Sequence, residues 1–391
     1  MSTTSHQTTS EKQFTQSYGL NEIALVPSDQ TLDMDLVDIS TTIAGHQLKI
    51  PIIASAMDSV VSPKTASTLG EYGALGILNL EGVQTRYDNP NEVLEQISKV
   101  KKRDYVALMQ KIYQQAIKPE LIEKRIQEIA QSGQTVAVSS TPQNAAKFGP
   151  IAEKAGANIF LIQSTVVSPK FLAKDQSKVL NLSEFCNQMN IPVLVGNTTT
   201  YEVTRKLLKT GVKGVFVGIG PGAACTTRGV LGIGVPMATA ITKTAAARND
   251  HFNETGDYIP IIADGGIVNS GDICKSLACG ADAVMIGSPL AKAAEAPGNG
   301  FHWGMATPNA ILPRGARIEV GSIATLKEIL LGPSNTDDGS QNLAGAIQTC
   351  LATLGVPNIK EMHNIEVLIA PSLLTEGKIF QKAQSLGMFK E

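Results

Sequence analysis

The sequence predicts a single α/β catalytic domain, a (β/α)8 or TIM barrel, on three observations. Of its 391 residues, 43% are hydrophobic, 5% are aromatic and 35 are glycine, a composition typical of α/β proteins with small core side chains. Short apolar runs without two-residue alternation recur along the chain, as in parallel strands that are covered on both faces. Segments of helical character separate these runs, without an obvious domain break.

The apolar runs give the expected strands. They lie at residues 52–57, 74–79, 136–139, 158–162, 192–196, 214–218, 261–264 and 283–287. Eight strand–helix units in one chain favour a closed barrel over an open sheet. A doubly wound parallel sheet is the alternative fold.

Capping residues mark several of the expected helices. Ser62 followed by Pro63 is typical of a helix start, because a serine accepts from the first turn and proline fits the first helical position. Thr200 is expected to cap a helix over 201–210 that Gly211 ends. Residues 271–278 read in the same way, with the stop at Gly280.

Three segments lie outside the eight units. Residues 1–17 are polar and lack an apolar stretch, which predicts a disordered tail ahead of one barrel domain over 18–391. Residues 80–135 and the region from Pro289 to the C-terminus exceed what a barrel needs. Long ordered loops at the catalytic face of a barrel often act as flaps, so the C-terminal excess predicts a flap region. The alternative for both is a surface linker.

Composition excludes several classes of function. The formal net charge is −2 and no dense basic stripe is present, so we expect no nucleic-acid partner. No apolar run approaches a membrane span, so we expect no membrane partner. The five cysteines form no CxxC pair and their number is odd, which favours a reducing compartment, the cytoplasm. The five histidines form no HxxxH pair, so no zinc site is expected.

A phosphate site is expected where the seventh and eighth strands end. Asp264, Gly265 and Gly266 follow one strand, and Gly287 and Ser288 follow the other. The loops after these strands are where barrels bind phosphate, and glycines let backbone N–H groups approach it closely. Asp264 is placed to accept hydrogen bonds from ribose hydroxyls. Ordinary tight turns are the alternative reading.

The loop after the sixth strand carries the candidate nucleophile. Residues 218–229 are too rich in glycine to form a helix and match neither a P-loop nor a dinucleotide-binding motif, and their free carbonyls suit a monovalent cation. A Cys225 thiolate there would add to an electrophilic carbon, with Arg228 or nearby N–H groups stabilising it and Thr227 relaying a proton. The alternative is a small buried cysteine. The remaining cysteines lie in helical segments and are expected to be structural: Cys186, Cys274, Cys279 and Cys350.

Several motifs together resemble one family. The loop GIGPGAACTTR at 218–228 is similar to the catalytic loop of the IMP dehydrogenase/GMP reductase family. The other matching motifs occur in family order: ASAMDSV at 54–60, VGN at 195–197, ADGGI at 263–267, MIGSPLA at 285–291 and Gly304-Met305.

The resemblance implies a reaction at purine C2. Cys225 would attack this carbon; in a dehydrogenase hydride then leaves to NAD and water releases XMP, whereas in a reductase ammonia leaves GMP and NADPH delivers hydride to give IMP. Thr227 would relay the proton, and potassium would bind carbonyls of Gly220, Gly222 and Cys225. The nucleotide contacts implied are Ser55, Met57, Asn197, Gly222, Asp264, Gly265, Gly266, Gly287, Ser288, Gly304 and Met305.

Departures from the family pattern favour one of these two reactions over the other. The interval 80–135 is too short for the family's CBS domain, so no CBS domain is expected, as in the short IMP dehydrogenase-related subgroup. The dehydrogenase's Arg-Tyr pair has no counterpart between Phe301 and Glu319, and Pro313-Arg314-Gly315 stands where a reductase carries its flap glutamate. Gln163 and Ala223 replace the usual acidic residue and serine. Without a base to activate water, GMP reductase is favoured and IMP dehydrogenase is the alternative.

The resemblance also implies the partners. NADPH, or NAD in the alternative, and potassium would be the cofactors, GMP and IMP the nucleotides, and a homo-oligomer, a tetramer or octamer, the assembly. Two other hypotheses stay open at this point: a barrel enzyme that uses flavin, and a nucleotide-binding regulator without turnover.

Overall fold

The computed structural model describes residues 14–175, 179–305, 316–371 and 376–389. Most of the tail expected at 1–17 therefore lies outside the described residues, and so does Pro313-Arg314-Gly315. At the start of the described chain, Phe14 is 93% exposed. In the described part of the chain, no helix is long and apolar enough to cross a membrane.

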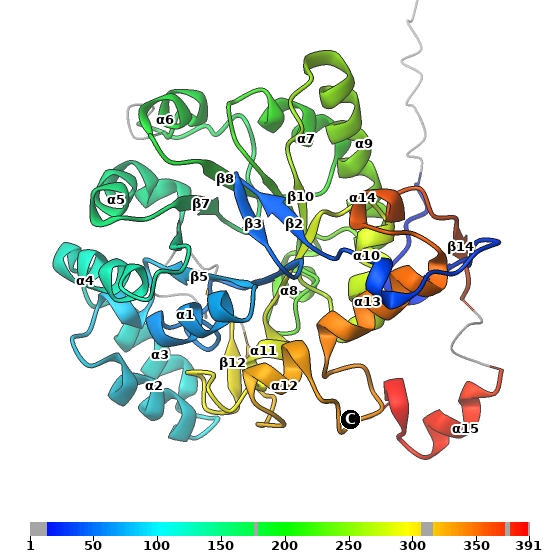
Figure 1. Cartoon of the computed structure of the whole chain (residues 1–391). Helices are drawn as coiled ribbons and strands as arrows, with labels where there is room; N and C mark the ends of the chain where they lie inside the picture. Colours follow the sequence, from blue (N-terminus) through cyan, green and yellow to red (C-terminus); the bar gives the residue numbers. More distant parts are fainter. Residues whose placement is uncertain (1–13, 176–178, 306–315, 372–375, 390–391) are drawn as a thin grey trace, which may run out of the picture.

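Eight parallel strands form a closed barrel, as predicted (Figure 1). Each pairs with its neighbours in chain order, and β11 closes the ring by pairing with β4 through Val284–Ile52 and Ile286–Ala54. This closing pair excludes the doubly wound sheet. The strands coincide with the predicted apolar runs: β4 (Ile52–Ala54), β5 (Leu75–Asn79), β6 (Ala137–Ser140), β7 (Ile159–Gln163), β8 (Val193–Thr198), β9 (Val215–Val217), β10 (Ile261–Asp264) and β11 (Ala283–Ile286).

Helices surround the barrel, and the predicted caps hold their starts. Ser62 accepts from the backbone N–H of Thr65, and Thr200 accepts from that of Val203. The helix after Thr200 ends at Leu208, two residues before its predicted end. The surrounding helices are α1 (Pro63–Glu71), α5 (Pro142–Ala155), α6 (Leu182–Gln188), α7 (Tyr201–Leu208), α9 (Met237–Thr255), α10 (Ser270–Ala278) and α11 (Ser288–Ala291).

A small hairpin fills the end of the barrel where the strands begin. Strands β2 (Thr41–Ile43) and β3 (His46–Leu48) form it just before β4. Ile43 and Leu48 belong to the same buried cluster as the inward-facing side chains of the barrel, such as Phe216. This end is therefore sealed, which leaves the carboxyl ends of the strands as the open face.

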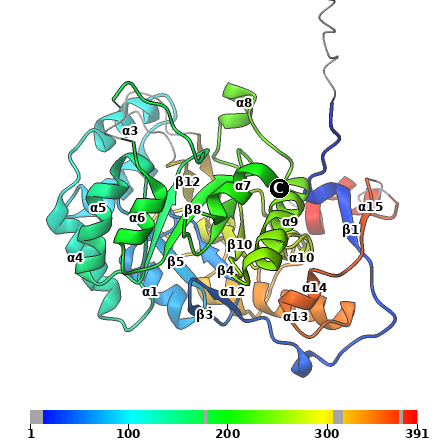
Figure 2. The same cartoon turned by 90° about the horizontal axis from the view of Figure 1, so that it is seen from above.

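Residues 80–136, all of which the structure describes, form helices rather than a separate domain. They are η3 (Val83–Thr85), α2 (Pro90–Lys99), α3 (Tyr105–Tyr113) and α4 (Pro119–Ala130). We call residues 82–115 the β5–β6 insertion. Figure 2 shows α3 at the outer edge of this side of the molecule.

The C-terminal excess carries a hairpin and a helical layer. Strands β12 (Phe301–Trp303) and β13 (Arg317–Glu319) pair in antiparallel fashion and form the flap. The remaining elements are η1 (Leu20–Glu22), β1 (Ile23–Leu25), η2 (Met34–Leu36), α12 (Leu326–Leu331), α13 (Leu343–Leu354), α14 (Ile359–Met362), β14 (Val367–Ile369), α15 (Lys378–Ala383) and η5 (Gly387–Phe389). Strand β14 pairs with β1, which places residues 367–369 beside residues 23–25.

A buried ion pair ties the strand beginnings to α9. Arg248, 1% exposed, donates to Asp282 over 2.7 Å, and Asp282 also accepts from Tyr258 and from the backbone N–H of Ile261 at the start of β10. A buried charge that loses its partner keeps the cost of its desolvation. The pair therefore holds this end of the barrel only while both members are present.

Replacing Asp282 with alanine should lower the free energy of unfolding by roughly 3–5 kcal/mol, because Arg248 would stay buried without its carboxylate. Asp257→Ala is the control, since Asp257 forms an exposed pair with Lys213 and should lose no more than about 1 kcal/mol. Chemical denaturation of both variants measures the difference. Equal losses would contradict this account of the ion pair.

Candidate active site

Three polar side chains, from β7, β8 and β10, meet at the carboxyl ends of their strands. Asp264 ends β10, and its Oδ2 accepts from Asn197 Nδ2 over 2.7 Å and from Gln163 Nε2 over 2.9 Å. Asn197 Nδ2 also donates to the carbonyl oxygen of Gly218 over 2.9 Å. The three ends of β7, β8 and β10 are thus joined by side chains, and the start of the cysteine loop is fixed to them.

Burial raises the pKa of Asp264 to about 6, and the hydrogen bonds from Asn197 and Gln163 act in the opposite direction. Gln163 stands where the family pattern usually has an acidic residue. In this chain a second carboxylate there would face Asp264, whereas the amide donates to it. The sequence alone did not reveal this role, because strand ends that are distant in the chain meet only in the closed barrel.

Glycines bring the cysteine loop into contact with the end of β10. A Cβ atom on Gly218 would lie 2.2 Å from the carbonyl oxygen of Asp264, and one on Gly266 would lie 2.9 Å from Cβ of Pro221. Gly265, with a φ of 86°, packs against Pro221 and the backbone nitrogen of Gly222. Side chains at these positions would separate the two loops, so the glycines are needed for the close approach.

Cys225 and Thr227 are brought together on this loop. The Cys225 thiol donates to Thr227 Oγ1 over 3.2 Å, and the thiol is exposed whereas Thr227 is buried. The backbone N–H of Cys225 donates to the carbonyl of Gly222 over 3.0 Å, which closes a turn. An exposed thiol beside a fixed hydroxyl is a geometry suited to nucleophilic attack coupled to proton relay.

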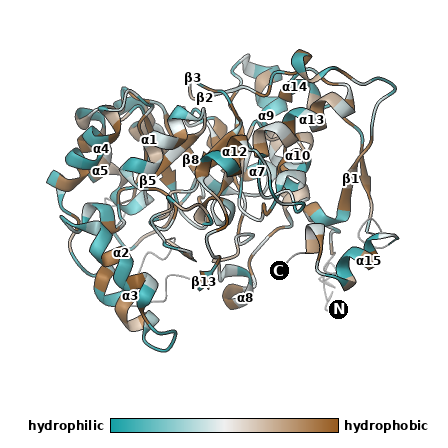
Figure 3. Ribbon diagram, turned by 60° about the horizontal axis from the view of Figure 1, so that its bottom comes forward, coloured by the Kyte–Doolittle hydropathy of each residue, from teal (hydrophilic) through white to brown (hydrophobic). Residues whose placement is uncertain are grey.

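Two expectations for this loop were wrong. Residues 218–229 are not free of helix, because α8 (Thr227–Leu231) begins within them. Arg228 does not face the thiol as expected: its Nη2 donates to the carbonyl of Val235 over 3.0 Å, within its own loop. Figure 3 shows α8 standing away from the barrel.

The predicted phosphate residues converge with a histidine that the sequence analysis missed. A Cβ on Gly287 would lie 3.2 Å from His302 Nε2 and 3.3 Å from Ser55 Oγ. Ser288 is the first residue of α11, beside this point. The sequence pattern did not predict a role for His302, because a single histidine forms no motif with a second residue at a fixed spacing.

His302 is a neutral hydrogen-bonding group at this position. Its Nδ1 lies 2.9 Å from Ser59 Oγ, and burial lowers its pKa to about 4. If Ser59 donates to Nδ1, the ring proton sits on Nε2, on the side of Gly287 and Ser55. That arrangement adds one donor to the backbone N–H groups of the predicted phosphate site.

The flap lies against the cysteine loop and against α3. The backbone N–H of Ala316, directly before β13, donates to the carbonyl of Ala224 beside Cys225 over 3.2 Å. Gly304 and Met305 follow β12, and Met305 Sδ lies 3.3 Å from the Tyr113 hydroxyl. Met57 is half-buried on the segment that follows β4. The predicted base-contacting residues therefore come from the β4 segment and the flap.

The carbonyls predicted to bind a monovalent cation belong to one loop, and two of them, those of Gly222 and Cys225, lie at the ends of one turn. The Gly222 carbonyl accepts the Cys225 N–H, which leaves a second lone pair. A set of uncharged carbonyl oxygens suits a hard monovalent cation, so Gly220, Gly222 and Cys225 fit potassium in their donor chemistry. In the described part of the chain, no cluster of His, Cys, Asp and Glu that would hold a metal ion is present.

The comparisons with known proteins decide the family. The sequence profile of the IMP dehydrogenase / GMP reductase domain matches residues 17–307. The chain belongs to this family. It is 37% identical to an uncharacterized oxidoreductase of Mycolicibacterium smegmatis over 361 residues, which cover 90% of this chain and 96% of that protein.

Two further comparisons agree. The inosine-5'-monophosphate dehydrogenase of Cryptosporidium parvum is 32% identical over 295 residues, 71% of this chain and 68% of that protein. The crystal structure of an IMP dehydrogenase/GMP reductase-like protein from Corynebacterium glutamicum superposes with a TM-score of 0.85 at 34% identity, covering 90% of this chain and 94% of that one. The chain is therefore an oxidoreductase of the IMP dehydrogenase/GMP reductase family, which acts on purine nucleotides, and the resemblance drawn from the motifs is confirmed.

Three of the other cysteines of this family member have raised thiol pKa values, whereas the hydrogen bond with Cys274 lowers the pKa of Cys350. Burial raises the pKa of the Cys186 thiol to about 11 and that of Cys279 to about 12. Cys274 is buried on α10, with its pKa well above the usual range, chiefly through its hydrogen bond to Cys350 and then through burial. Raised thiol pKa values disfavour the nucleophilic thiolate.

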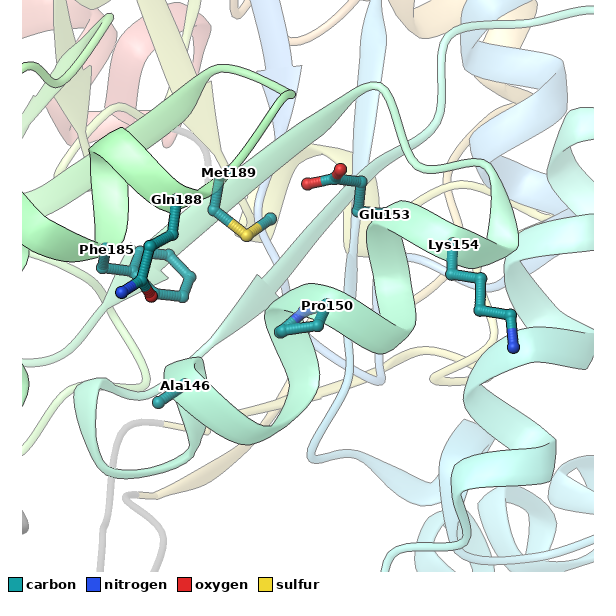
Figure 4. Close-up of a pocket in the computed structure, with 7 residues that line it drawn as sticks. All are labelled: Ala146, Pro150, Glu153, Lys154, Phe185, Gln188 and Met189. Carbon is teal, nitrogen blue, oxygen red and sulfur yellow. The ribbon is translucent and has the colours of Figure 1, made fainter.

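A groove on the outside of the barrel is unrelated to this site. Figure 4 shows it between α5 and α6, with Phe185 and Met189 on one side and Glu153 on the other. Glu153 accepts from the backbone N–H of Asn190 over 3.0 Å, so its carboxylate holds the α6–β8 connection. The groove contains none of the predicted site residues.

The raised pKa of Asp264 predicts a pH-dependent stability. The folded state favours the neutral Asp264 carboxyl. Its contribution to the stability of the fold is therefore present below about pH 4 and is lost as the pH rises through about 6. Asp264→Asn should therefore match the wild type near pH 4 and become more stable than it by roughly 1–3 kcal/mol at pH 7. Denaturation curves at several pH values measure the difference; a gap that does not vary with pH would contradict it.

Proposed function

We propose that this protein is a GMP reductase, which converts GMP to IMP and ammonia with NADPH through a covalent bond between Cys225 and purine C2. The observation that carries the proposal is the contact of the exposed Cys225 thiol with Thr227, on a loop whose facing flap sequence lacks an Arg-Tyr pair for water activation. IMP dehydrogenase, with NAD and IMP, is the second candidate.

The atoms balance in two steps. The Cys225 sulfur forms a bond to C2 of GMP and the bond from C2 to the exocyclic nitrogen breaks, so that ammonia leaves with a proton delivered through Thr227. In the second step C2 gains a hydride and its bond to sulfur breaks, which regenerates the thiolate and releases IMP. Bound NADPH would supply that hydride. In the dehydrogenase alternative, water takes the place of the hydride and needs a base.

The remaining site residues would hold the nucleotide. Backbone N–H groups at Gly266 and Gly287, with the hydroxyls of Ser55 and Ser288, would bind the phosphate. Asp264 would accept from the ribose hydroxyls. The base would lie between the β4 segment and the flap: Met57, Gly304 and Met305.

Potassium and self-association belong to the same proposal. Potassium bound to carbonyls of Gly220, Gly222 and Cys225 would shape the turn that presents the thiol. Exposed apolar residues of α8 and the following loop support a homo-oligomer, because Val230 and Leu231 are 74% and 63% exposed.

Nicotinamide absorbance in potassium buffer tests the reaction. One cuvette holds GMP with NADPH, and the other holds IMP with NAD. We expect absorbance to fall in the first and to stay constant in the second. A rise in the second alone would establish the dehydrogenase instead, and no change in either with tight GMP binding would favour a regulator.

Cys225→Ala should abolish turnover and retain nucleotide binding, because the thiol forms the reactive bond whereas other residues hold the phosphate and ribose. Calorimetric titration with GMP and the absorbance assay measure the two effects. Cys186→Ala is the control, since that thiol lies on α6 outside the site. Turnover by Cys225→Ala would overturn the covalent mechanism.

A further inference from the structure

The flap does not stand alone: it shares a hydrophobic cluster with the β5–β6 insertion. Trp303 of β12 is fully buried among side chains of η3, α2 and α3, and Phe301 and Met305 pack against the same cluster. The insertion therefore packs against the part of the flap that carries Met305, an expected base contact. The members of the cluster are Val83, Val93, Leu94, Ile97, Tyr105, Met109, Ile112, Tyr113 and Trp303.

One hydroxyl connects three segments within this contact. Tyr113, at the end of α3, lies with its hydroxyl 2.7 Å from Asp58 Oδ2 and 3.3 Å from Met305 Sδ, and it accepts from Trp303 Nε1 over 3.0 Å. The hydroxyl proton points to the carboxyl oxygen, which is the nearer and stronger acceptor. Asp58 in turn accepts from the backbone N–H of Val83 over 2.9 Å.

The opposite strand of the flap is held by an arginine. Arg317 of β13 donates to the carbonyls of Ser98 and Val100 over 3.2 and 2.8 Å, at the carboxyl end of α2. Its guanidinium also lies 5.2 Å from the ring centroid of Tyr105 and 4.5 Å from that of Phe301. Both strands of the flap are thus fastened to the insertion, and neither attachment involves a barrel strand.

We infer that Tyr113 is a positioning residue, whose hydroxyl sets Met305 and the β4 segment in the arrangement that grips the purine base. Methionine has three rotatable bonds and packs in many ways, so a fixed contact at its sulfur restricts a side chain that would otherwise adapt. Asp58 directly follows Met57, so the same hydroxyl orients both expected base contacts. The inference rests on the proposed nucleotide site, and assigns the insertion a part in substrate binding.

Tyr113→Phe tests the inference, because it removes the hydroxyl and keeps the buried ring. We expect the Kd for GMP and for IMP to rise about tenfold, since Trp303 Nε1 and Asp58 lose a shared partner and the base contacts are released. In the wild-type enzyme and the variant, iodoacetamide should modify Cys225 at the same rate without nucleotide. Protection by GMP should need about tenfold more nucleotide in the variant.

Tyr87→Phe is the matched control. Its hydroxyl belongs to the same insertion and donates to the carbonyl of Ile112 over 3.0 Å, a partner within the insertion itself. Loss of this hydroxyl should affect stability as Tyr113→Phe does and leave the Kd for nucleotide unchanged. Trp303 is the only tryptophan of the chain, so its fluorescence reports directly on the contact. The change in emission on adding GMP should differ from wild type in Tyr113→Phe and not in Tyr87→Phe.

The outcomes distinguish a wrong positioning role for Tyr113 from a wrong proposed function. If the wild-type protein binds GMP and IMP and Tyr113→Phe binds both with unchanged Kd, the positioning role is wrong and the proposed function stands. If the wild-type protein binds neither nucleotide, the proposed function is wrong and the inference fails with it. Should Tyr113→Phe not fold, Asp58→Ala removes the carboxylate through which the same hydroxyl contacts the β4 segment, and an unchanged Kd in that variant overturns the inference equally.

Discussion

The close backbone contact between the ends of β9 and β10 is the constraint on which the site depends. Gly218 lies against the carbonyl of Asp264, and Gly265 and Gly266 lie against Pro221 and Gly222. This contact holds the loop that carries Cys225 beside the residues predicted to bind ribose and phosphate. Asn197 reinforces it, since its amide donates to Gly218 and to Asp264 at once.

The flap adds a second, separate support. It touches the cysteine loop through Ala316 and Ala224 and the β4 segment through His302 and Ser59, yet its strands are anchored on the β5–β6 insertion. The part of the chain that the family pattern leaves for a regulatory domain is here a short helical insertion packed on the flap. The barrel is thus combined with a flap, the proposed base-binding side, that packs on helices outside the barrel.

The barrel was predictable because its strands are local features. Short runs such as 261–264 and 283–287 are apolar whatever they pair with, and capping residues such as Ser62 act within one turn of their own helix. The catalytic-loop residues were also predictable, because they form a contiguous motif. Gln163, His302 and Tyr113 were not, because each acts through partners distant in sequence, and a single glutamine, histidine or tyrosine carries no pattern. Arg228 was misread for a different reason: its partner, Val235, is near in sequence, and the fold of the loop decides which carbonyl it meets.

The central claim is that Cys225 forms a covalent bond with purine C2 and that hydride, rather than water, resolves it. The most direct measurement is an acid quench of the enzyme mixed with GMP and no NADPH, followed by peptide mass spectrometry. We expect a purine nucleotide attached to the Cys225 peptide, with ammonia released in equal amount and the adduct discharged as IMP once NADPH is added. An unmodified Cys225 peptide together with full turnover of GMP when NADPH is present would contradict it.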